Sequence, residues 1–438
     1  MVEREQHLPS SAYLAYGRHV NPPLAQFLSL SGRDQHFVKA AGCYLITDQG
    51  ESYADWIAGM GSLNLGHNHP RLIDCITKHI SAGTPNLFIE NLNPFAGMLA
   101  KQLVHSLGED FATCFFSNSG TEAVEAAIKL AIAATGRRMI VYCQDGYHGT
   151  TLGALSMMAQ GVYRERFEPL LPSFQAIPFG DLAALQTALS EQPAAFVLEP
   201  IQIEAGLRIL PHGFLAAAKA MCREQGTLLV LDEVQTGLGR TGSLCAFQQE
   251  GAAPDILVLA KSLGGGLVPI GAMVAGPGLF ARAYGDYRAC EIHNSTFGGN
   301  ALACQVALAT LSIIEQRDFL VTVSERGEQL NHLLTNTLSE HPLVAGITMR
   351  GLLGGIKLRD LDHPWFSWQN LGIDDFANMP IVGPLLVHRM YRRKVLVQVC
   401  GHDWNTIRIE PPLIVSEPEC ETFVAILKEQ LDWIYENG

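Results

Sequence analysis

The sequence predicts an α/β protein in which helices cover a mostly parallel central sheet and both chain ends build a smaller α/β lobe. Its 438 residues are too many for one ordinary compact core, so at least two lobes are expected. The middle of the chain alternates short apolar segments with amphipathic stretches, and runs such as LLVLD and ILVLA indicate strands buried on both faces. We place a large domain at residues 76–323, an N-terminal part of the small lobe at 1–75 and a C-terminal small domain at 324–438.

Six short apolar segments supply the strands of the predicted central sheet. They are Thr113–Ser117, Met139–Cys143, Ala195–Glu199, Thr227–Asp232, Ile256–Ala260 and Gly271–Ala275. Stretches with a helical apolar pattern lie between them, at Glu122–Ala134, Leu182–Glu191 and Gly213–Gln225. Because strands and helices follow one another in this way, a sheet of mostly parallel strands is expected.

The two ends of the chain have a different pattern. A turn-rich, strand-like stretch covers Gly42–Ile57. After the middle of the chain, a long helix is predicted to begin at about Ser324. Strand-like segments follow at Gly351–Leu358 and Val395–Val399, and Glu417–Tyr435 forms a final helix.

Composition restricts the partners and the compartment. Apolar residues make up 48% of the chain and charged residues 17%, so a large core is expected. The formal net charge of −13 argues against a nucleic-acid partner and gives no reason to expect a membrane surface. No apolar stretch is as long as a membrane span, and the N-terminus lacks the apolar core of a signal peptide. The ten cysteines are scattered without a CxxC pair, so a reducing cytoplasm is the default.

A predicted strand runs directly into Ser119, Gly120 and Thr121, where a helix begins. Glycine lets backbone N–H groups come close to an anion, and a helix N-terminus favours negative charge. The segment therefore predicts a phosphate cradle. Alternatively, it is an ordinary helix start with Thr121 as the capping residue and Glu122 as an early acidic residue.

Two further charged residues stand at strand ends. Asp232 ends a buried strand, at the edge where open α/β folds bind ligands, although it could also cap the next turn. Lys261 follows another apolar run, and a partly desolvated lysine can lose its proton and form a Schiff base. The alternative is a lysine that is simply exposed. A phosphate cradle, a strand-end aspartate and a strand-end lysine therefore follow one another in the chain. All three together are far less expected by chance than any one alone.

Six motifs together resemble one enzyme family. They are NSGTEAVEAAIKLA, EPIQ, LDEVQTGLGRTG, LAKSLGGG, STFGGN and TIRIEPPL. They closely resemble the class III aminotransferases of the pyridoxal 5′-phosphate (PLP) fold type I group, over the chain from about Phe37 to Leu431. GRTG and TIRIEPPL are most similar to the putrescine (diamine) branch, and the ornithine type is the other near relative. The resemblance implies a central sheet of the seven-stranded type, PLP as cofactor and a homodimer.

The resemblance assigns roles around the cofactor. Lys261 resembles the lysine that forms the Schiff base and moves a proton between the substrate and the cofactor. Asp232 resembles the partner of the pyridine nitrogen, which lets the ring act as an electron sink. Gln235 resembles the residue bonded to the phenolic oxygen, and Val234 the apolar residue under the ring. Tyr147 resembles the aromatic residue on the other ring face, with a core tyrosine as the alternative. The remaining cofactor residues that we expect are Ser119, Gly120, Thr121, His148 and Glu199.

Three other residues carry roles toward substrates and a partner subunit. Thr296 resembles a residue that reaches the phosphate of the neighbouring subunit, which would make the active site shared and a dimer obligatory. Arg408 resembles the arginine that grips a substrate carboxylate. Glu204 resembles the gate that pairs with this arginine when an amine lacks a carboxylate. The alternative for both is a structural ion pair.

Three departures from the family pattern concern the substrate. Ile203 stands where many relatives have a glycine, and it adds bulk close to Glu204. Thr150 stands where ornithine-type enzymes have an arginine, and Met60 where they have a substrate-binding tyrosine. We expect Thr150 and Met60 at the substrate. Both changes favour a substrate end that is uncharged, or cationic without a carboxylate.

The resemblance implies a ping-pong aminotransferase that works through Lys261. It would move an amino group from a primary amine, such as putrescine, to a 2-oxo acid such as 2-oxoglutarate or pyruvate. An ornithine or acetylornithine type, or an aminotransferase of specialised metabolism acting on an aldehyde, is an alternative. More remote alternatives are an aminomutase, racemase or decarboxylase of the same fold, and a scaffold without catalysis.

Two other features have less specific interpretations. The segment 360–383, which contains Trp365, Phe366 and Trp368, is longer than expected and is either a loop packed on its own domain or a docking surface. His67 and His69 in GHNHP are expected in a structural turn, because no third ligand stands near them and no metal is predicted.

Overall fold

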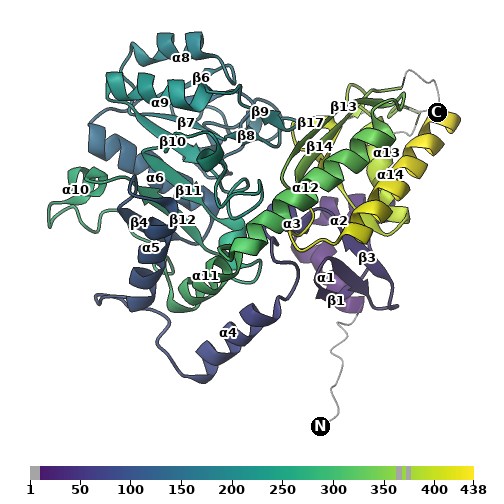
Figure 1. Cartoon of the computed structure of the whole chain (residues 1–438), viewed down its shortest axis with the longest axis horizontal. Coiled ribbons are helices and arrows are strands. Elements are labelled where there is room, and N and C mark those ends of the chain that lie inside the picture. The colour runs from purple at the N-terminus through teal and green to yellow at the C-terminus, as the bar shows by residue number, and fades with distance from the viewer. Residues whose placement is uncertain (1–9, 362–366, 371–375) are drawn as a thin grey trace.

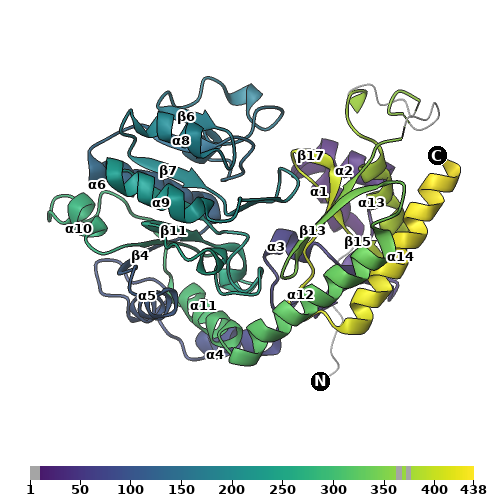
Figure 2. The same cartoon turned by 45° about the horizontal axis from the view of Figure 1, so that its top comes forward.

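Residues 10–361, 367–370 and 376–438 are described by the structure, a computed structural model (Figure 1). A body around the central sheet lies on one side, and on the other the first elements of the chain lie beside the last ones (Figures 1 and 2). Of the three aromatic residues in the segment 360–383, Trp365 and Phe366 lie outside the described residues. Trp368 packs edge-on against Trp404, with ring centroids 6.1 Å apart.

The central sheet has seven strands in the order β4-β12-β11-β10-β7-β5-β6. All neighbouring pairs are parallel except those of β12, which is antiparallel to β11 and to β4. The prediction of a mostly parallel sheet is therefore confirmed. The strands are β4 (Thr113–Ser117), β5 (Ile140–Cys143), β6 (Phe174–Ile177), β7 (Ala195–Leu198), β10 (Leu228–Asp232), β11 (Ile256–Leu259) and β12 (Gly271–Ala275).

One strand of this sheet, β6, was not predicted. It is an edge strand, and only its last residue, Ile177, is buried. The inner strands are buried at every position and therefore show a continuous apolar run, whereas β6 does not.

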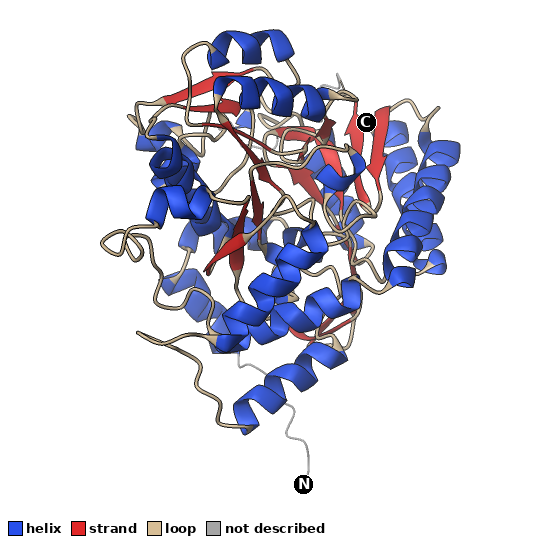
Figure 3. Ribbon diagram, turned by 60° about the vertical axis from the view of Figure 1, so that its left-hand side comes forward, coloured by secondary structure: helices blue, strands red, loops and turns tan. Residues whose placement is uncertain are grey.

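Helices cover both faces of the sheet (Figure 3). Alternate strand residues point to opposite faces, so Val230 packs with α6 while Leu229 and Leu231 pack on the other side. The helices on the Val230 face are α6 (Gly120–Thr135), α7 (Leu152–Leu155) and α10 (Leu279–Tyr284). Those on the Leu229 face are α4 (Pro70–Ser81), α5 (Pro94–Leu107), α8 (Leu182–Leu189), α9 (Phe214–Gln225) and α11 (Ala301–Ile314).

Residues from both chain ends share a second apolar core. Trp56, near the start of the chain, stacks on Phe423 with ring centroids 3.7 Å apart. One sheet has the order β1-β2-β3-β15 and another the order β13-β14-β17-β16. The strands are β1 (Phe37–Ala41), β2 (Tyr44–Thr47), β3 (Ser52–Asp55), β13 (Val344–Arg350), β14 (Leu353–Leu358), β15 (Val395–Leu396), β16 (Gln398–Cys400) and β17 (Asp403–Ile409). The helices are α12 (Arg317–Leu338), α13 (Val382–Arg392) and α14 (Glu417–Asn437).

One predicted helix boundary is wrong. The long helix expected from about Ser324 begins earlier, at Arg317. Only two residues separate it from the end of α11 at Ile314, so the sequence has little room for a loop that would mark the boundary. The domain limits at 75/76 and 323/324 stay a prediction, since α4 and α12 each run across one of them. The remaining short elements are α1 (Ser10–His19), α2 (Pro22–Leu30), α3 (Ala58–Gly61), β8 (Ile201–Gln202), β9 (Arg208–Ile209) and the 3-10 turns η1 (Glu165–Phe167), η2 (Ala246–Gln249) and η3 (Lys261–Gly264).

None of the helices in the described part of the chain has both the length and the apolar character that a membrane span needs. The cytoplasmic location stays a prediction.

Candidate active site

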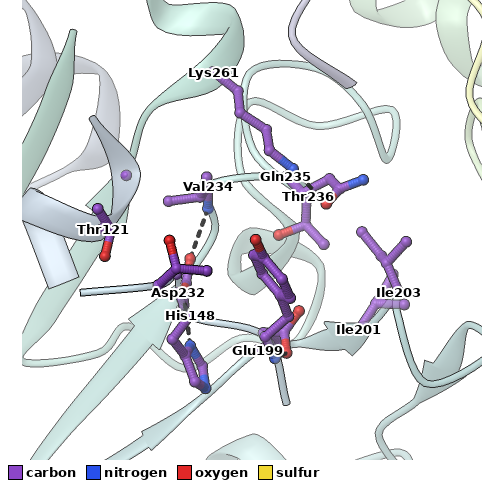
Figure 4. Close-up of a pocket in the computed structure, with 14 residues that line it drawn as sticks. Thr121, His148, Glu199, Ile201, Ile203, Asp232, Val234, Gln235, Thr236 and Lys261 are labelled. Atoms are coloured by element: carbon purple, nitrogen blue, oxygen red, sulfur yellow. Dashed lines mark hydrogen bonds and ion pairs between the residues drawn. The ribbon is translucent and has the colours of Figure 1, made fainter. Parts of the chain in front are cut away.

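A pocket lies at the carboxyl ends of the central strands, and many of the predicted site residues meet there (Figure 4). Its cavity measures about 230 Å³. Strand β10 delivers Asp232, and η3, which follows β11, delivers Lys261. The predicted residues that line the pocket are Gly120, Thr121, Tyr147, His148, Thr150, Glu199, Asp232, Val234, Gln235 and Lys261.

Asp232 is held on both of its carboxylate oxygens. Its Oδ2 lies 2.8 Å from Nδ1 of His148, and its Oδ1 accepts a hydrogen bond from the backbone N–H of Val234 at 3.0 Å. Burial lowers the pKa of His148, but the hydrogen bond and the charge of Asp232 outweigh burial, so the pKa is raised. The raised pKa gives His148 a larger protonated fraction than an ordinary histidine has at the same pH. Its other ring nitrogen, Nε2, is buried and has no hydrogen-bond partner.

Lys261 is partly buried, and its side chain reaches toward Gln235 (Figure 4). Burial lowers the pKa of its amine, and the positive charge of Arg408 lowers it further. The carboxylates of Glu410, Glu204 and Asp232 act in the opposite direction without reversing the shift. A lowered pKa increases the fraction of neutral amine, which is the nucleophilic form.

The backbone of Lys261 is unusual as well. Its φ of 46° lies in the left-handed region, which costs a residue with a side chain on the order of 1 kcal/mol or more. Strain of this kind is common where a functional group must be aimed into a site. The ε-amine donates a hydrogen bond to Oε1 of Gln235.

The predicted cradle is the N-terminus of α6. Ser119 is the capping residue, because its Oγ accepts from the backbone N–H of Glu122 at 3.3 Å. The alternative that made Thr121 the cap is wrong: its hydroxyl lies 2.7 Å from that of Thr151 instead. A Cβ on Gly120 would come within 3.0 Å of Val234, so a glycine keeps this approach open. Ser119 itself lines a neighbouring cavity, with Gly120 and Lys261, rather than this pocket.

Tyr147 and Glu199 lie together on the other side of the pocket. The backbone N–H of Tyr147 donates to Oε1 of Glu199 at 2.9 Å. Tyr147 is 37% exposed, so the alternative of a core tyrosine does not apply. Burial raises the pKa of Glu199 to about 8, which makes it a protonated, uncharged group at neutral pH.

Arg408 and Glu204 form a buried ion pair near this pocket. Arg408 stands on β17 and is 2% exposed. Its Nη1 donates to Oε1 of Glu204, and its Nη2 donates to Oε1 of Gln398 at 2.9 Å. The backbone N–H of Gly401 supports the other oxygen of Glu204 at 2.6 Å. Burial raises the pKa of Glu204, but the charge of Arg408 and this backbone bond lower it more strongly.

Several residues that contribute here were missed by sequence reasoning. Ile201, Thr236 and Gly149 also line the pocket, as does Ile203, which was noted only as a departure. Glu410 is fully buried and accepts from Nε2 of Gln235 at 2.6 Å. Glu410 directly follows β17, and no local pattern in the sequence would have identified it.

Two predicted residues lie away from the pocket. Met60 is half exposed, has a φ of 59° and does not line the cavity. Thr296 is exposed and lines a separate groove with residues of the segments 87–93 and 290–300. Within one chain, neither Met60 nor Thr296 reaches the pocket.

The two histidines of GHNHP have structural surroundings. Nε2 of His67 lies 2.8 Å from Oδ2 of Asp55, and His69 is the N-cap residue of α4. Within residues 10–361, 367–370 and 376–438, no group of three or more His, Cys, Asp or Glu side chains could hold a metal ion.

Comparisons with known proteins point in one direction. A family model described as aminotransferase class-III matches residues 31–431. Aminotransferase PigE from Serratia sp. (strain ATCC 39006) is 37% identical over 446 residues, which cover 94% of this chain and 52% of that protein. The chain therefore spans about half the length of this relative.

Solved structures are similar over nearly the whole chain. The ornithine aminotransferase of Toxoplasma gondii has a TM-score of 0.82 and 27% identity, covers 98% of this chain and 99% of its own, and was found with partial occupancy of PLP. The acetylornithine aminotransferase of Elizabethkingia anophelis has a TM-score of 0.74 and 27% identity, with 93% and 98% covered.

Proposed function

This chain belongs to the class-III aminotransferase family, and we propose that it moves an amino group from a primary amine to a 2-oxo acid. The donor that we propose is a diamine such as putrescine or a related amine, and the acceptor is 2-oxoglutarate or pyruvate. The observation that carries the proposal is the buried pair of Arg408 and Glu204 beside the Lys261 pocket. An arginine with an exchangeable carboxylate partner can serve one substrate with a carboxylate and another without one.

The family uses PLP, and the pocket fits this cofactor. The α6 N-terminus can receive a phosphate, since Gly120 leaves open the space that a Cβ would fill. Asp232, fixed by His148, offers a carboxylate to a pyridinium nitrogen. When bound, PLP supplies an electron sink for the substrate carbon. The residues that we propose to hold it are Ser119, Gly120, Thr121, Tyr147, His148, Glu199, Asp232, Val234, Gln235 and Lys261.

Lys261 is the proposed acid and base. Its amine has a lowered pKa, so it can take a proton from the substrate carbon and deliver it again on the same side. Gln235 holds the amine in place through its Oε1. The isoleucine side chains at 201 and 203 line the same pocket and reduce the access of water to these groups.

Arg408 and Glu204 are proposed to alternate between the two substrates. While paired, Glu204 neutralises the guanidinium and leaves no site for a carboxylate. When a 2-oxo acid enters, its carboxylate replaces that of Glu204 on Arg408. Thr150 lines the pocket where ornithine-type enzymes have an arginine, which supports an amine without an α-carboxylate as donor.

We also propose a homodimer. The segments 87–93 and 290–300 line one groove, which includes Thr296. Ile89, Leu92, Ile292 and Phe297 expose more than half of their surface near this groove. Apolar side chains that gather on a surface in this way often mark a protein contact. A second copy would place Thr296 at the other subunit's cofactor phosphate.

The second candidate is an ornithine or acetylornithine aminotransferase, which the solved structures favour. A donor panel separates the two. The purified PLP-bound protein is mixed with putrescine, cadaverine, L-ornithine or N-acetyl-L-ornithine, and the absorbance of the cofactor is followed in a single turnover. We expect the diamines to react faster than either amino acid. A faster reaction with L-ornithine or its acetyl derivative would instead support the second candidate.

A further inference from the structure

Glu410 connects the two ends of the site. Its side chain is fully buried. One carboxylate oxygen, Oε1, accepts a hydrogen bond from Nε2 of Gln235 at 2.6 Å. The other, Oε2, lies 3.3 Å from Nε of Arg408. The same carboxylate therefore touches the residue that holds Lys261 and the residue that would bind the oxo acid.

The contact with Gln235 fixes the direction of the Gln235 amide. A carboxylate only accepts hydrogen bonds, so the NH₂ group of the amide must face Glu410. The carbonyl oxygen of the amide must then face the amine of Lys261, which donates to it. Without Glu410, the amide would lose the acceptor on its NH₂ side, and only the contact with Lys261 would favour this orientation.

The contact with Arg408 gives this arginine a second counter-ion. Glu204 and Glu410 approach different nitrogens of the guanidinium, and Gln398 supplies an uncharged acceptor to the third. A buried charge that loses its only partner is strongly destabilising. If Glu204 moves aside for a 2-oxo acid, Arg408 is still paired with Glu410, so the exchange does not create an unpaired buried cation.

We propose that Glu410 is a positioning residue that holds Gln235 and Arg408 at once, as the permanent counter-ion of an arginine whose other carboxylate partner is exchangeable. The Arg408 half of this inference rests on the proposed function, whereas the Gln235 half does not. A carboxylate at this position also ties the charge state of Lys261 to the arginine, because one buried group contacts both Arg408 and Gln235, the partner of Lys261.

The charged groups that face Lys261 set the expected direction. Glu410, Glu204 and Asp232 are carboxylates that favour a positive charge on its nitrogen, and Arg408 opposes it. Replacement of Glu410 by glutamine removes one negative charge and leaves the positive charge of Arg408 less neutralised. Both effects disfavour the protonated form at Lys261. The pH midpoint of the cofactor absorbance, which reports the proton at the Lys261 nitrogen, should therefore move to lower pH.

The experiment compares Glu410→Gln with Gln398→Met in the PLP-bound protein. Gln398 accepts a hydrogen bond from Arg408, and in the described part of the chain no hydrogen bond joins it to Gln235, so it is a matched control for the arginine half. We expect Glu410→Gln to lower the absorbance midpoint by about one pH unit and to raise the KM for the 2-oxo acid by about tenfold. Gln398→Met should raise only the KM. If Glu410→Gln does not fold, Glu410→Asp keeps the charge with a shorter reach and should keep the midpoint while the KM rises.

Three outcomes would overturn the inference. They are a Glu410→Gln midpoint within about 0.2 pH units of the wild type, an equal midpoint shift in Gln398→Met, and a Glu410→Asp variant with a wild-type KM. A protein that turns over no 2-oxo acid would instead contradict the proposed function. The absorbance titration would still test the Gln235 half in that case, because it needs only the bound cofactor.

Discussion

The two ends of the pocket hold their charged groups in different ways. At the cofactor end, Asp232 is fixed by a neighbouring backbone N–H and by a buried histidine, and Lys261 by an uncharged amide. At the substrate end, Arg408 is held mainly by two carboxylates, of which Glu204 is 15% exposed on its side chain and Glu410 is not exposed at all. Groups fixed by backbone and amides have little freedom to exchange partners, whereas a charge paired with other charges can exchange them. We infer that chemistry is performed at the rigid end and that substrate choice is made at the exchangeable end.

The largest expected effect belongs to the rigid end. Lys261→Ala removes the proposed acid and base and the proposed attachment point of PLP, so multiple-turnover transamination should fall by several orders of magnitude while the fold survives. Lys219→Ala is the control, because Lys219 pairs with Asp255 at 2.8 Å and does not line the pocket. Steady-state assays and circular dichroism of both variants test this. Retained turnover in Lys261→Ala would contradict the assignment of the chemistry to the cofactor end of the pocket.

The apolar cluster around Ile203, which forms one wall of the pocket, is expected to be firmly packed. Ile203 is fully buried against Ile201, Leu207 and Leu353. Ile203→Ala should lower the free energy of unfolding by about 2–5 kcal/mol, because it leaves a cavity. The same change should let bulkier amines react. Chemical denaturation measures the first effect, and Val321→Ala, at a half-exposed position, is the control. A loss below about 0.5 kcal/mol would show that this wall is loose.

Glu199 predicts a pH dependence that belongs to the cofactor end. Its pKa in the folded protein is about 8, above the ordinary value of 4.5, so the folded state holds the proton more tightly than the unfolded state does. The stability from protonated Glu199 is therefore fully present below pH 4.5 and is lost as the pH rises through about 8. Glu199→Gln removes this dependence.

Thermal unfolding between pH 5 and 9 checks this prediction. As the pH rises, the free energy of unfolding of Glu199→Gln should increase relative to that of the wild type. The increase should be at least about 1.4 kcal/mol, the equivalent of one pKa unit. Glu191→Gln, at an exposed position, is the control. A constant difference between Glu199→Gln and the wild type over this pH range would mean that Glu199 is ionised in the folded protein.

The smallest expected effect concerns Thr296, which lies outside both ends of the pocket within one chain. If a second copy brings its hydroxyl to the cofactor phosphate, Thr296→Ala should weaken PLP binding by about fivefold, the loss of one hydrogen bond of about 1 kcal/mol. Equilibrium dialysis measures the affinity, and sedimentation at several protein concentrations measures the oligomer. A fully active monomer would show that the site is complete in one chain.

The difference between the two ends also explains what the sequence could reveal. Asp232, Lys261 and the Gly120 cradle were found because each stands where a strand ends or a helix begins, which is a local pattern. Glu410 and Gln398 were missed because their contacts join residues of different elements, and an isolated glutamate or glutamine has no local pattern. In the fold, the inner strands were predicted from their apolar runs. The edge strand β6 and the start of α12 lack such signals.

The most direct test of the central claim measures the two half-reactions separately in Arg408→Ala. Each is followed in a single turnover, first with a diamine and the PLP form, then with a 2-oxo acid and the aminated form. Arg208→Ala is the matched control, since Arg208 is half exposed and pairs with Asp145. We predict that the oxo-acid half-reaction loses about 2–5 kcal/mol of transition-state stabilisation and that the amine half-reaction changes far less. Equal losses in both half-reactions would contradict the division between a rigid and an exchangeable end.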